Sequence, residues 1–588
     1  MAGATGAASG GGGPARTAGG IRHGGRGGHA MMRRRIAATT VALAAALAAR
    51  QAAASTPHDI AWGTCPEAWV GTHTGLLGNR LQCATLGMPL DHAAPDHRRI
   101  DVGVVRIRAA VPAAREGAIF FNKGGPGAHP GRLMRSMGEG WTRTDAGDPQ
   151  DGDKRRLAER FDLVAVIPRG LVGSHPILCL TGMPPRYPFL PTHLDDDTWQ
   201  LVRDEAQGIV GACGAHATAR FVNTEQHVHD MEAVRRTLGD ERLHFYGISY
   251  GGAVGAWYAS MYPTHTGRLL LDSSMDFTHD YRVALRLAMA ARQAAFNRDV
   301  AGPVLRAPAH YGLDGDAAAV SARITGLPDA AREAWGHQLD TSARLAAALH
   351  LATWLGTDSA GTLAAMRRRI RQSTFTTDAV VDRQIRWHAD DLARGFFATP
   401  PTEPSFVISP DGDAVRILTS CNDAPWTRTE AEMRESLARD VARFVDITGD
   451  ETLEELTCSR WAGPSARAPD LSVLERAAPF LLIQSENDTN TPLVGGQFIV
   501  ARFPNARMLL VRDSNVHGVF NFTNTGCVER TAARYLLTGS LPASTSRVFA
   551  CDAVAGAPAD QLPGTPRPPV PEPQPVDPPA TPAAHDEF

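Results

Sequence analysis

One short turn constrains the fold of this chain more than any other feature of its sequence. Residues 247–251 read Gly-Ile-Ser-Tyr-Gly, between an apolar run at 243–246 that is typical of a buried strand and a helical apolar pattern at 255–262. A serine on such a strand–turn–helix element sits in a sharp turn that exposes its hydroxyl, and glycines are needed because side chains would collide there. The pattern predicts Ser249 as a nucleophile; the alternative is an ordinary glycine-rich turn.

Apolar strand-like runs alternate with helical patterns along much of the chain. The strand-like runs are 101–108, 118–121, 161–167, 243–246, 268–271, 480–484 and 508–511, and helical spacing is clearest at 225–238 and 528–537. Short apolar runs of this kind suit strands that are covered on both faces. The alternation predicts an α/β fold with a mostly parallel sheet flanked by helices.

The segment 276–410 has a different character. It is rich in Ala, Arg and Leu and shows helical patterns at 343–355 and 363–370, with few strand-like runs. We expect a helical lid here, inserted between an N-terminal part of the core at 60–275 and a C-terminal core module at 411–552.

A serine hydroxyl is a poor nucleophile and needs an adjacent base, with an acid to orient that base. Where a serine occupies a strand–turn–helix elbow of this type, the chain order is serine, acid, histidine. His517 follows the run at 508–511, and Asp488 follows the run at 480–484. We therefore predict His517 as the base and Asp488 as the acid, with Glu486 and Asp513 as the alternatives for the acid.

Acyl transfer also requires hydrogen-bond donors for the negative oxygen of the tetrahedral intermediate. Residues 122–127 read Asn-Lys-Gly-Gly-Pro-Gly and follow the early strand-like run at 118–121. Glycines let the backbone approach a substrate closely. The expected oxyanion hole consists of the N–H groups of Gly125 and Tyr250.

These pieces together resemble the secreted tripeptidyl aminopeptidases of actinobacteria, relatives of the prolyl iminopeptidases with an α/β-hydrolase fold. The resemblance runs through 122–127, 161–170, 244–251, Cys421, Cys458, 488–492, 517–518 and 527–528. It implies the same roles for Ser249, Asp488 and His517, and a recognisable C-terminal module from about Cys421 to Cys551. The chain departs from the family pattern at Lys123, Ala128, His129 and Ile167, and these changes bear on substrate preference.

Both ends of the chain have a biased composition. Residues 1–30 are mostly Gly, Ala and Arg, and the region from 556 to 588 is dominated by Pro and Ala, so neither can build a core. Between residues 31 and 54 a basic start, a short apolar run and small residues predict a signal peptide, with an Ala-rich helix as the alternative. The apolar run is too short for a transmembrane helix, so the mature protein is expected to be secreted or periplasmic without a stable membrane span.

The chain has eight cysteines and no CxxC motif, which argues against zinc or thioredoxin chemistry. An even number in an exported chain predicts disulfides, whereas buried free thiols would be expected in a cytosolic protein. Connectivity does not follow from the sequence, and pairing in sequence order is the simplest hypothesis.

The net charge of −3 and the scattered basic residues give no indication of nucleic-acid binding. No metal, nucleotide or redox cofactor is implied. The leading hypothesis is a serine exopeptidase that takes a peptide with a free N-terminus, its ammonium held by an acidic group for which Asp423 and Glu225 are candidates. The alternatives are an esterase or lactonase with the same triad and a non-catalytic binding protein on the same scaffold.

Overall fold

The computed structural model describes residues 60–180, 195–357, 361–398, 412–443, 450–523, 525–542 and 546–553. The predicted low-complexity segment at 1–30, the signal peptide at 31–54 and the Pro-rich tail at 556–588 lie outside these ranges. The described residues form one compact unit. Within the described residues, no helix is long and apolar enough to cross a membrane.

The described residues of this unit contain a nine-stranded sheet in the order β1-β2-β4-β3-β5-β6-β7-β8-β9. The pairs β1–β2 and β2–β4 are antiparallel, and the remaining neighbours are parallel. The strands are β1 Leu81–Pro89, β2 Arg99–Ile107, β3 Gly117–Asn122, β4 Phe161–Val166, β5 Leu243–Ile248, β6 Thr266–Asp272, β7 Phe480–Ser485, β8 Ala506–Arg512 and β9 Val548–Asp552.

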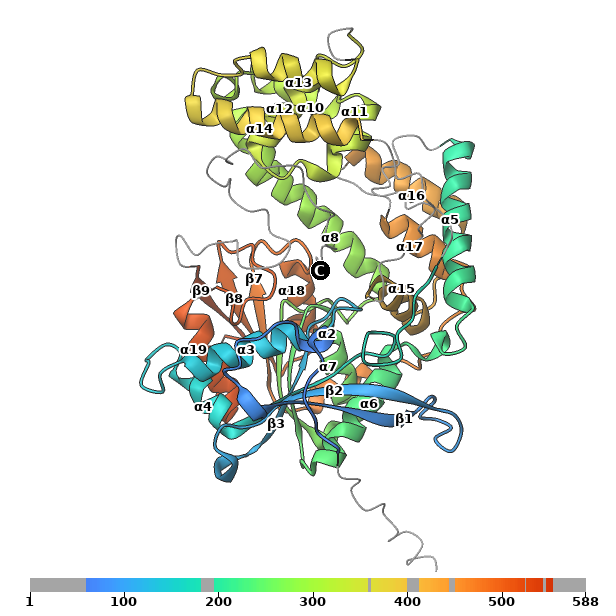
Figure 1. The fold of residues 1–588 in the computed structure, drawn as a ribbon, viewed down its shortest axis with the longest axis vertical. Coiled ribbons are helices and arrows are strands. Elements are labelled where there is room, and N and C mark those ends of the chain that lie inside the picture. Colours follow the sequence, from blue (N-terminus) through green and yellow to red (C-terminus); the bar gives the residue numbers. More distant parts are fainter. Residues whose placement is uncertain are drawn as a thin grey trace, which may run out of the picture. The chain divides into compact units, whose positions relative to one another are not determined.

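Alternate residues of the central strands enter two separate apolar clusters, one on each face of the sheet. On β3, for example, Ile119 packs with one cluster and Phe120 with the other. Helices α3 Gly131–Arg143, α4 Gly152–Arg160 and α19 Gly526–Thr538 cover the first face, and α6 Thr224–Leu238, α7 Tyr250–Met261 and α18 Leu493–Arg502 cover the second (Figure 1). The predicted α/β-hydrolase fold, a mostly parallel sheet between helices, is confirmed.

The two outermost strands, β1 and β9, were not predicted from the sequence. In β1, Gln82, Thr85 and Gly87 interrupt the apolar pattern, and one edge of the strand has no partner strand among the described residues. β9 is five residues long and pairs only with β8. Short or polar edge strands carry a weak sequence signal because only part of their surface is buried.

Between β6 and β7 the described chain is helical. The helices that begin with a hydrogen-bonded Asp or Thr cap are α8 Tyr281–Ala295, α10 Ala317–Thr325, α12 Ser342–Ala352, α13 Leu363–Gln372 and α14 Ala379–Phe396. An apolar cluster of their own joins α9 Gly302–Arg306, α10, α11 Asp329–Trp335, α12, α13 and α14, and Figure 1 shows α10–α14 as neighbouring helices. Helices continue past residue 410 through α15 Gly412–Asp423, α16 Glu430–Arg443 and α17 Asp450–Ser459.

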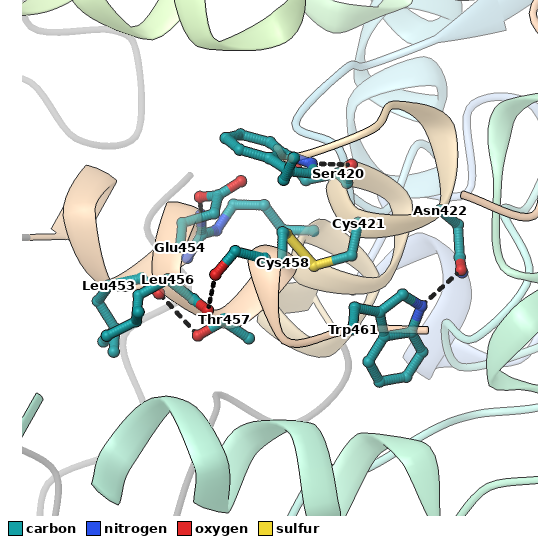
Figure 2. The surroundings of a disulfide bond; sticks show 12 residues. Ser420, Cys421, Asn422, Leu453, Glu454, Leu456, Thr457, Cys458 and Trp461 are labelled. Carbon is teal, nitrogen blue, oxygen red and sulfur yellow. Dashed lines mark hydrogen bonds and ion pairs between the residues drawn. A yellow bond between two sulfur atoms is a disulfide. The ribbon is translucent and has the colours of Figure 1, made fainter. Parts of the chain in front are cut away.

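All eight cysteines are paired, and the pairing follows sequence order as hypothesised: Cys65–Cys83, Cys179–Cys213, Cys421–Cys458 and Cys527–Cys551. Figure 2 shows the Cys421–Cys458 bond, which joins α15 to α17. Beside it, the indole N–H of Trp461 donates to Asn422 Oδ1 at 2.9 Å. The bond therefore holds the end of α15 against the end of α17, between two cysteines that are 37 residues apart in the sequence.

Candidate active site

Ser249 lies on the turn between β5 and α7, at the carboxyl edge of the sheet. Its backbone has φ +60° and ψ −124°, a conformation that few residues other than glycine adopt and that marks strain at functional turns. A Cβ on Gly247 would lie 2.4 Å from the carbonyl oxygen of Gly251, so the turn excludes side chains at that position. The Ser249 N–H donates to the carbonyl of Asp272 at 3.0 Å, which fixes the turn to β6.

Asp488 and His517 follow the parallel strands β7 and β8, so both reach the sheet edge where Ser249 lies. His517 Nδ1 is 2.9 Å from Asp488 Oδ2. A Cβ on Gly518 would lie 3.3 Å from Ile248 Cγ2, so the residue after His517 contacts the residue before Ser249. Burial alone would lower the pKa of His517, but the charge and hydrogen bond of Asp488 raise it above its ordinary value.

The Asp488 carboxylate is fully buried and held from its own loop. Its Oδ1 accepts from the backbone N–H groups of Asn490 at 2.9 Å and Thr491 at 3.1 Å. The Thr491 hydroxyl lies 2.9 Å from Asp488 Oδ2 and 3.2 Å from His517 Nδ1. This role of Thr491 was not predicted from the sequence.

The two alternative acids lie elsewhere. Glu486 and Asp513 are both exposed, and the backbone N–H of Asp513 donates to Glu486 Oε2 at 2.8 Å. They therefore tie the loop after β7 to the loop after β8. Of the three candidates, Asp488 is the one with a hydrogen bond to His517 among the described residues.

The expected oxyanion loop lies against the elbow. A Cβ on Gly124 would lie 3.0 Å from Ser249 Cβ and 3.3 Å from the backbone nitrogen of Tyr250. The Gly124 N–H donates to Asn122 Oδ1 at 2.8 Å, whereas Gly125, with φ +104°, is exposed. Tyr250 begins α7, where backbone N–H groups point out of the helix and favour a negative oxygen.

A buried histidine supports this loop from behind. His227 Nε2 lies 3.2 Å from Asn122 Nδ2, and burial lowers the pKa of His227 to about 4. Because Asn122 Oδ1 accepts from Gly124, its Nδ2 is the donor to His227, and the imidazole is neutral with its proton on Nδ1. Neither Asn122 nor His227 was assigned this role from the sequence.

The two candidate partners for a substrate ammonium have different environments. Arg467 engages Glu225 through its backbone N–H at 2.9 Å and its Nε at 3.2 Å. Asp423, at the end of α15, accepts from the Thr224 N–H at 2.9 Å, and the Thr224 hydroxyl bonds both Asp423 and the Tyr250 hydroxyl. Burial raises the pKa of Asp423 to about 7. Asp423 is thus linked to the residue that follows Ser249.

Within the described residues, no group of three or more His, Cys, Asp or Glu side chains is placed to hold a metal ion.

The sheet order, the serine elbow and the sequence comparisons together define the class of this chain: it is an α/β-hydrolase and an enzyme of the serine hydrolase group. Residues 445–548 match the family model described as TAP-like protein. This match covers β7, α18 and β8, with the loops that carry Asp488 and His517.

Curated relatives extend the similarity over most of the chain. A tripeptidyl aminopeptidase of Streptomyces coelicolor is 27% identical over 504 residues, which cover 82% of this chain and 85% of that protein. The serine protease Hip1 of Mycobacterium tuberculosis is 25% identical over 83% of this chain and 90% of its own length. A protein named carboxylesterase B from the same species is 26% identical over 83% and 89%. The predicted resemblance to tripeptidyl aminopeptidases is confirmed.

Proposed function

We propose that the chain is an exported exopeptidase that releases short peptides from substrates with a free N-terminus through an acyl-enzyme. One observation carries the proposal: the buried Asp488 carboxylate lies 2.9 Å from His517 Nδ1, in loops that reach the same sheet edge as the Ser249 elbow. Relatives named tripeptidyl aminopeptidase and serine protease support a peptide as the substrate.

In the first half-reaction, the Ser249 hydroxyl attacks the scissile carbonyl carbon while His517 Nε2 takes its proton. Asp488 holds the other ring nitrogen and stabilises the imidazolium. The carbonyl oxygen becomes negative and accepts from the N–H groups of Gly125 and Tyr250. His517 then gives its proton to the departing amine, and the C–N bond breaks.

In the second half-reaction, water replaces the amine. His517 takes a proton from the water as its oxygen attacks the Ser249 ester, and then returns a proton to the Ser249 oxygen as the C–O bond breaks. The released acid is the N-terminal peptide. Its length depends on how far the ammonium-binding group lies from Ser249.

Asp423 is the proposed partner for the substrate ammonium. Its carboxylate is half-buried and connected through Thr224 to Tyr250, whereas Glu225 already has a guanidinium partner in Arg467. An ammonium beside Asp423 would favour the charged carboxylate, which burial otherwise disfavours. Helices α8 to α17, inserted between β6 and β7, would restrict access to Ser249 to the ends of peptide chains.

The test compares kcat/KM for matched peptidyl anilides with free and acetylated N-termini, with a short-chain nitrophenyl ester alongside. Acetylation removes the ammonium and leaves the half-buried Asp423 carboxylate without its partner, so we expect a loss of about 10² or more in kcat/KM. Equal rates on free and acetylated peptides would contradict the exopeptidase assignment. The relative named carboxylesterase B favours an esterase as the second candidate, and fast ester cleavage without peptide turnover would select it.

Export is the other part of the proposal. Four disulfides are expected of a protein that matures in an oxidising compartment. N-terminal sequencing of protein recovered from the culture medium or the periplasm should find a mature start after about residues 52–55. The same protein, denatured without reductant, should contain no titratable thiol, and several free thiols would count against export.

A further inference from the structure

A second buried carboxylate lies beside the candidate triad. Asp272 ends β6, which pairs with β5 on one side and β7 on the other, so it sits between the strands that lead to Ser249 and Asp488. Its side chain is completely buried. The carboxylate oxygens accept from the backbone N–H groups of Val519 at 2.9 Å and Phe520 at 2.8 Å, and from the Tyr246 hydroxyl at 3.2 Å.

The next residue continues the same set of contacts. Ser273 has φ +46°, which is unusual for a residue with a side chain. Its Oγ accepts from the Gly518 N–H at 2.8 Å, and its carbonyl oxygen lies 2.7 Å from the Thr491 hydroxyl. Its own N–H donates to the Ile483 carbonyl on β7 at 2.8 Å.

Asp272 and Ser273 therefore contact all three loops of the candidate triad. The Asp272 carbonyl accepts from the Ser249 N–H at 3.0 Å, and the two side chains accept from the three successive N–H groups that follow His517. The Ser273 carbonyl meets Thr491, which contacts the Asp488 carboxylate. The proposed mechanism assigns no role to the Asp272 carboxylate.

We infer that Asp272 and Ser273 are positioning residues: they hold the loop 517–520 so that the His517 ring lies between Asp488 and Ser249. The inference rests on the proposed function for its catalytic consequence, but the loop contacts stand independently of it. A misplacement of about 1 Å in a catalytic group can reduce the rate by about 10². Asp272 and Ser273 fix the backbone that follows His517, and Asp488 fixes its ring, so the two sets of contacts together oppose such a displacement.

The Asp272 charge adds a second effect. Burial raises the pKa of Asp272 to about 6, although the N–H groups of Val519 and Phe520 act in the opposite direction. The titratable groups that face it are the Tyr246 hydroxyl and the His517 imidazole. The negative charges of Asp272 and Asp488 both raise the pKa of His517. Removing the charge should lower the pKa of His517 and extend activity to lower pH.

The test uses Asp272→Asn and Ser273→Ala in the full-length protein. Asn places an N–H group against the backbone donors, whereas Ser273→Ala removes the acceptor of Gly518 and keeps the Asp272 charge. Asp162→Asn is a matched control, because Asp162 is also buried and accepts from a backbone N–H, that of Ala109 at 2.7 Å, but lies at the start of β4. Active sites are first titrated with a fluorophosphonate, so that kcat on a nitrophenyl ester is expressed per labelled serine.

We expect both site variants to lose about 10- to 100-fold in kcat with KM little changed. Asp272→Asn should also move the acid limb of kcat/KM to lower pH, a shift absent from Ser273→Ala and Asp162→Asn. If these side chains only stabilised the fold, their replacement would reduce the number of active sites that the fluorophosphonate labels and would leave the acid limb of the kcat/KM profile unchanged. Wild-type kcat per site in Ser273→Ala would overturn the inference, including when Asp272→Asn fails to fold.

Hydrogen exchange separates this inference from the proposed function. The N–H groups of residues 518–520 should lose protection in both site variants and keep it in Asp162→Asn. Unchanged protection would overturn the positioning role whatever the activity. Failure of the wild-type protein to react with the fluorophosphonate would instead contradict the proposed mechanism and leave the exchange result as the measure of the loop contacts.

Discussion

The Asp488 carboxylate, wholly buried, lies 2.9 Å from Nδ1 of His517, whose side chain is 13% exposed. This hydrogen bond places the imidazole proton on Nδ1 and leaves Nε2 as the basic nitrogen, because a carboxylate accepts and does not donate. A base must expose the nitrogen that takes the proton, so partial exposure of the ring and complete burial of the acid suit their proposed roles. The pair thus has the polarity needed to activate a serine hydroxyl.

Replacing Ser249 by alanine should abolish turnover without unfolding the protein. Triad members act as a unit, and loss of the nucleophile in another serine hydrolase costs about 10⁶ in kcat. We expect a comparable loss for Ser249→Ala, together with loss of fluorophosphonate labelling. Ser260→Ala is the matched control, since Ser260 lies on the same helix, α7, and its hydroxyl bonds the Ala256 carbonyl. Labelling that persists in Ser249→Ala would exclude it as the nucleophile.

The identity of the acid can be settled by three isosteric substitutions. Asp488→Asn should reduce kcat by about 10⁴, the magnitude known for the corresponding change in a serine protease, because an amide stabilises the wrong imidazole tautomer. Glu486→Gln and Asp513→Asn should change kcat by less than about tenfold, since both side chains are exposed. A larger loss in either of them than in Asp488→Asn would reassign the acid.

The sequence supported some features of the site and not others for identifiable reasons. Asp488 and His517 each follow an apolar run within a few residues, and parallel strands deliver such loops to one edge, so their proximity could be anticipated. Asp272 also directly follows a strand-like run, and the same reasoning could have found it. The sequence around Asp272 does not reveal its hydrogen-bond partners, because Val519 and Phe520 are more than 240 residues away.

The choice between Asp423 and Glu225 shows the same limit. Both are single acids in helical surroundings, and nothing in their neighbours distinguishes them. The distinction comes from tertiary packing: α15, tied to α17 by Cys421–Cys458, brings Asp423 to Thr224, while Arg467 reaches Glu225 from another segment. Contacts between segments about 200 residues apart leave no periodic signal in either one.

His227 should make the protein sensitive to acid. Its pKa is about 4 in the folded protein and about 6.5 when exposed, so the unfolded chain binds the proton first as the pH falls. Stability is therefore lost between these two pH values, by about 2 kcal/mol between pH 7 and pH 5 for this one group. His227→Gln retains an acceptor for Asn122 and does not titrate.

We expect the fall in free energy of unfolding between pH 7 and pH 5 to be smaller in His227→Gln by about that amount. Urea unfolding at the two pH values measures it. The variant and the parent share all other titrating groups, including the buried carboxyls whose pKa values are raised, so their contributions cancel in the comparison. An equal acid sensitivity in the two proteins would show that the His227 imidazole does not carry the penalty.

The proposed ammonium partner gives the sharpest test of specificity, through pH. Asp423, with a pKa raised to about 7 by burial, must be ionised to bind the ammonium, so kcat/KM for free-amine peptides should fall as the pH drops through about 7. An acetylated peptide or a nitrophenyl ester does not need Asp423, so the acid limb of its kcat/KM profile should reflect the protonation of His517 alone. The two limbs are expected to differ in the parent enzyme and to coincide in Asp423→Asn, which should also lose the preference for free amines by about 10².

Glu225→Gln is the control for this prediction. The Glu225 charge raises the pKa of Asp423, so this variant should keep the preference while its free-amine limb moves to lower pH. Retention of the full free-amine preference in Asp423→Asn, or its loss in Glu225→Gln alone, would move the ammonium site from Asp423 to Glu225.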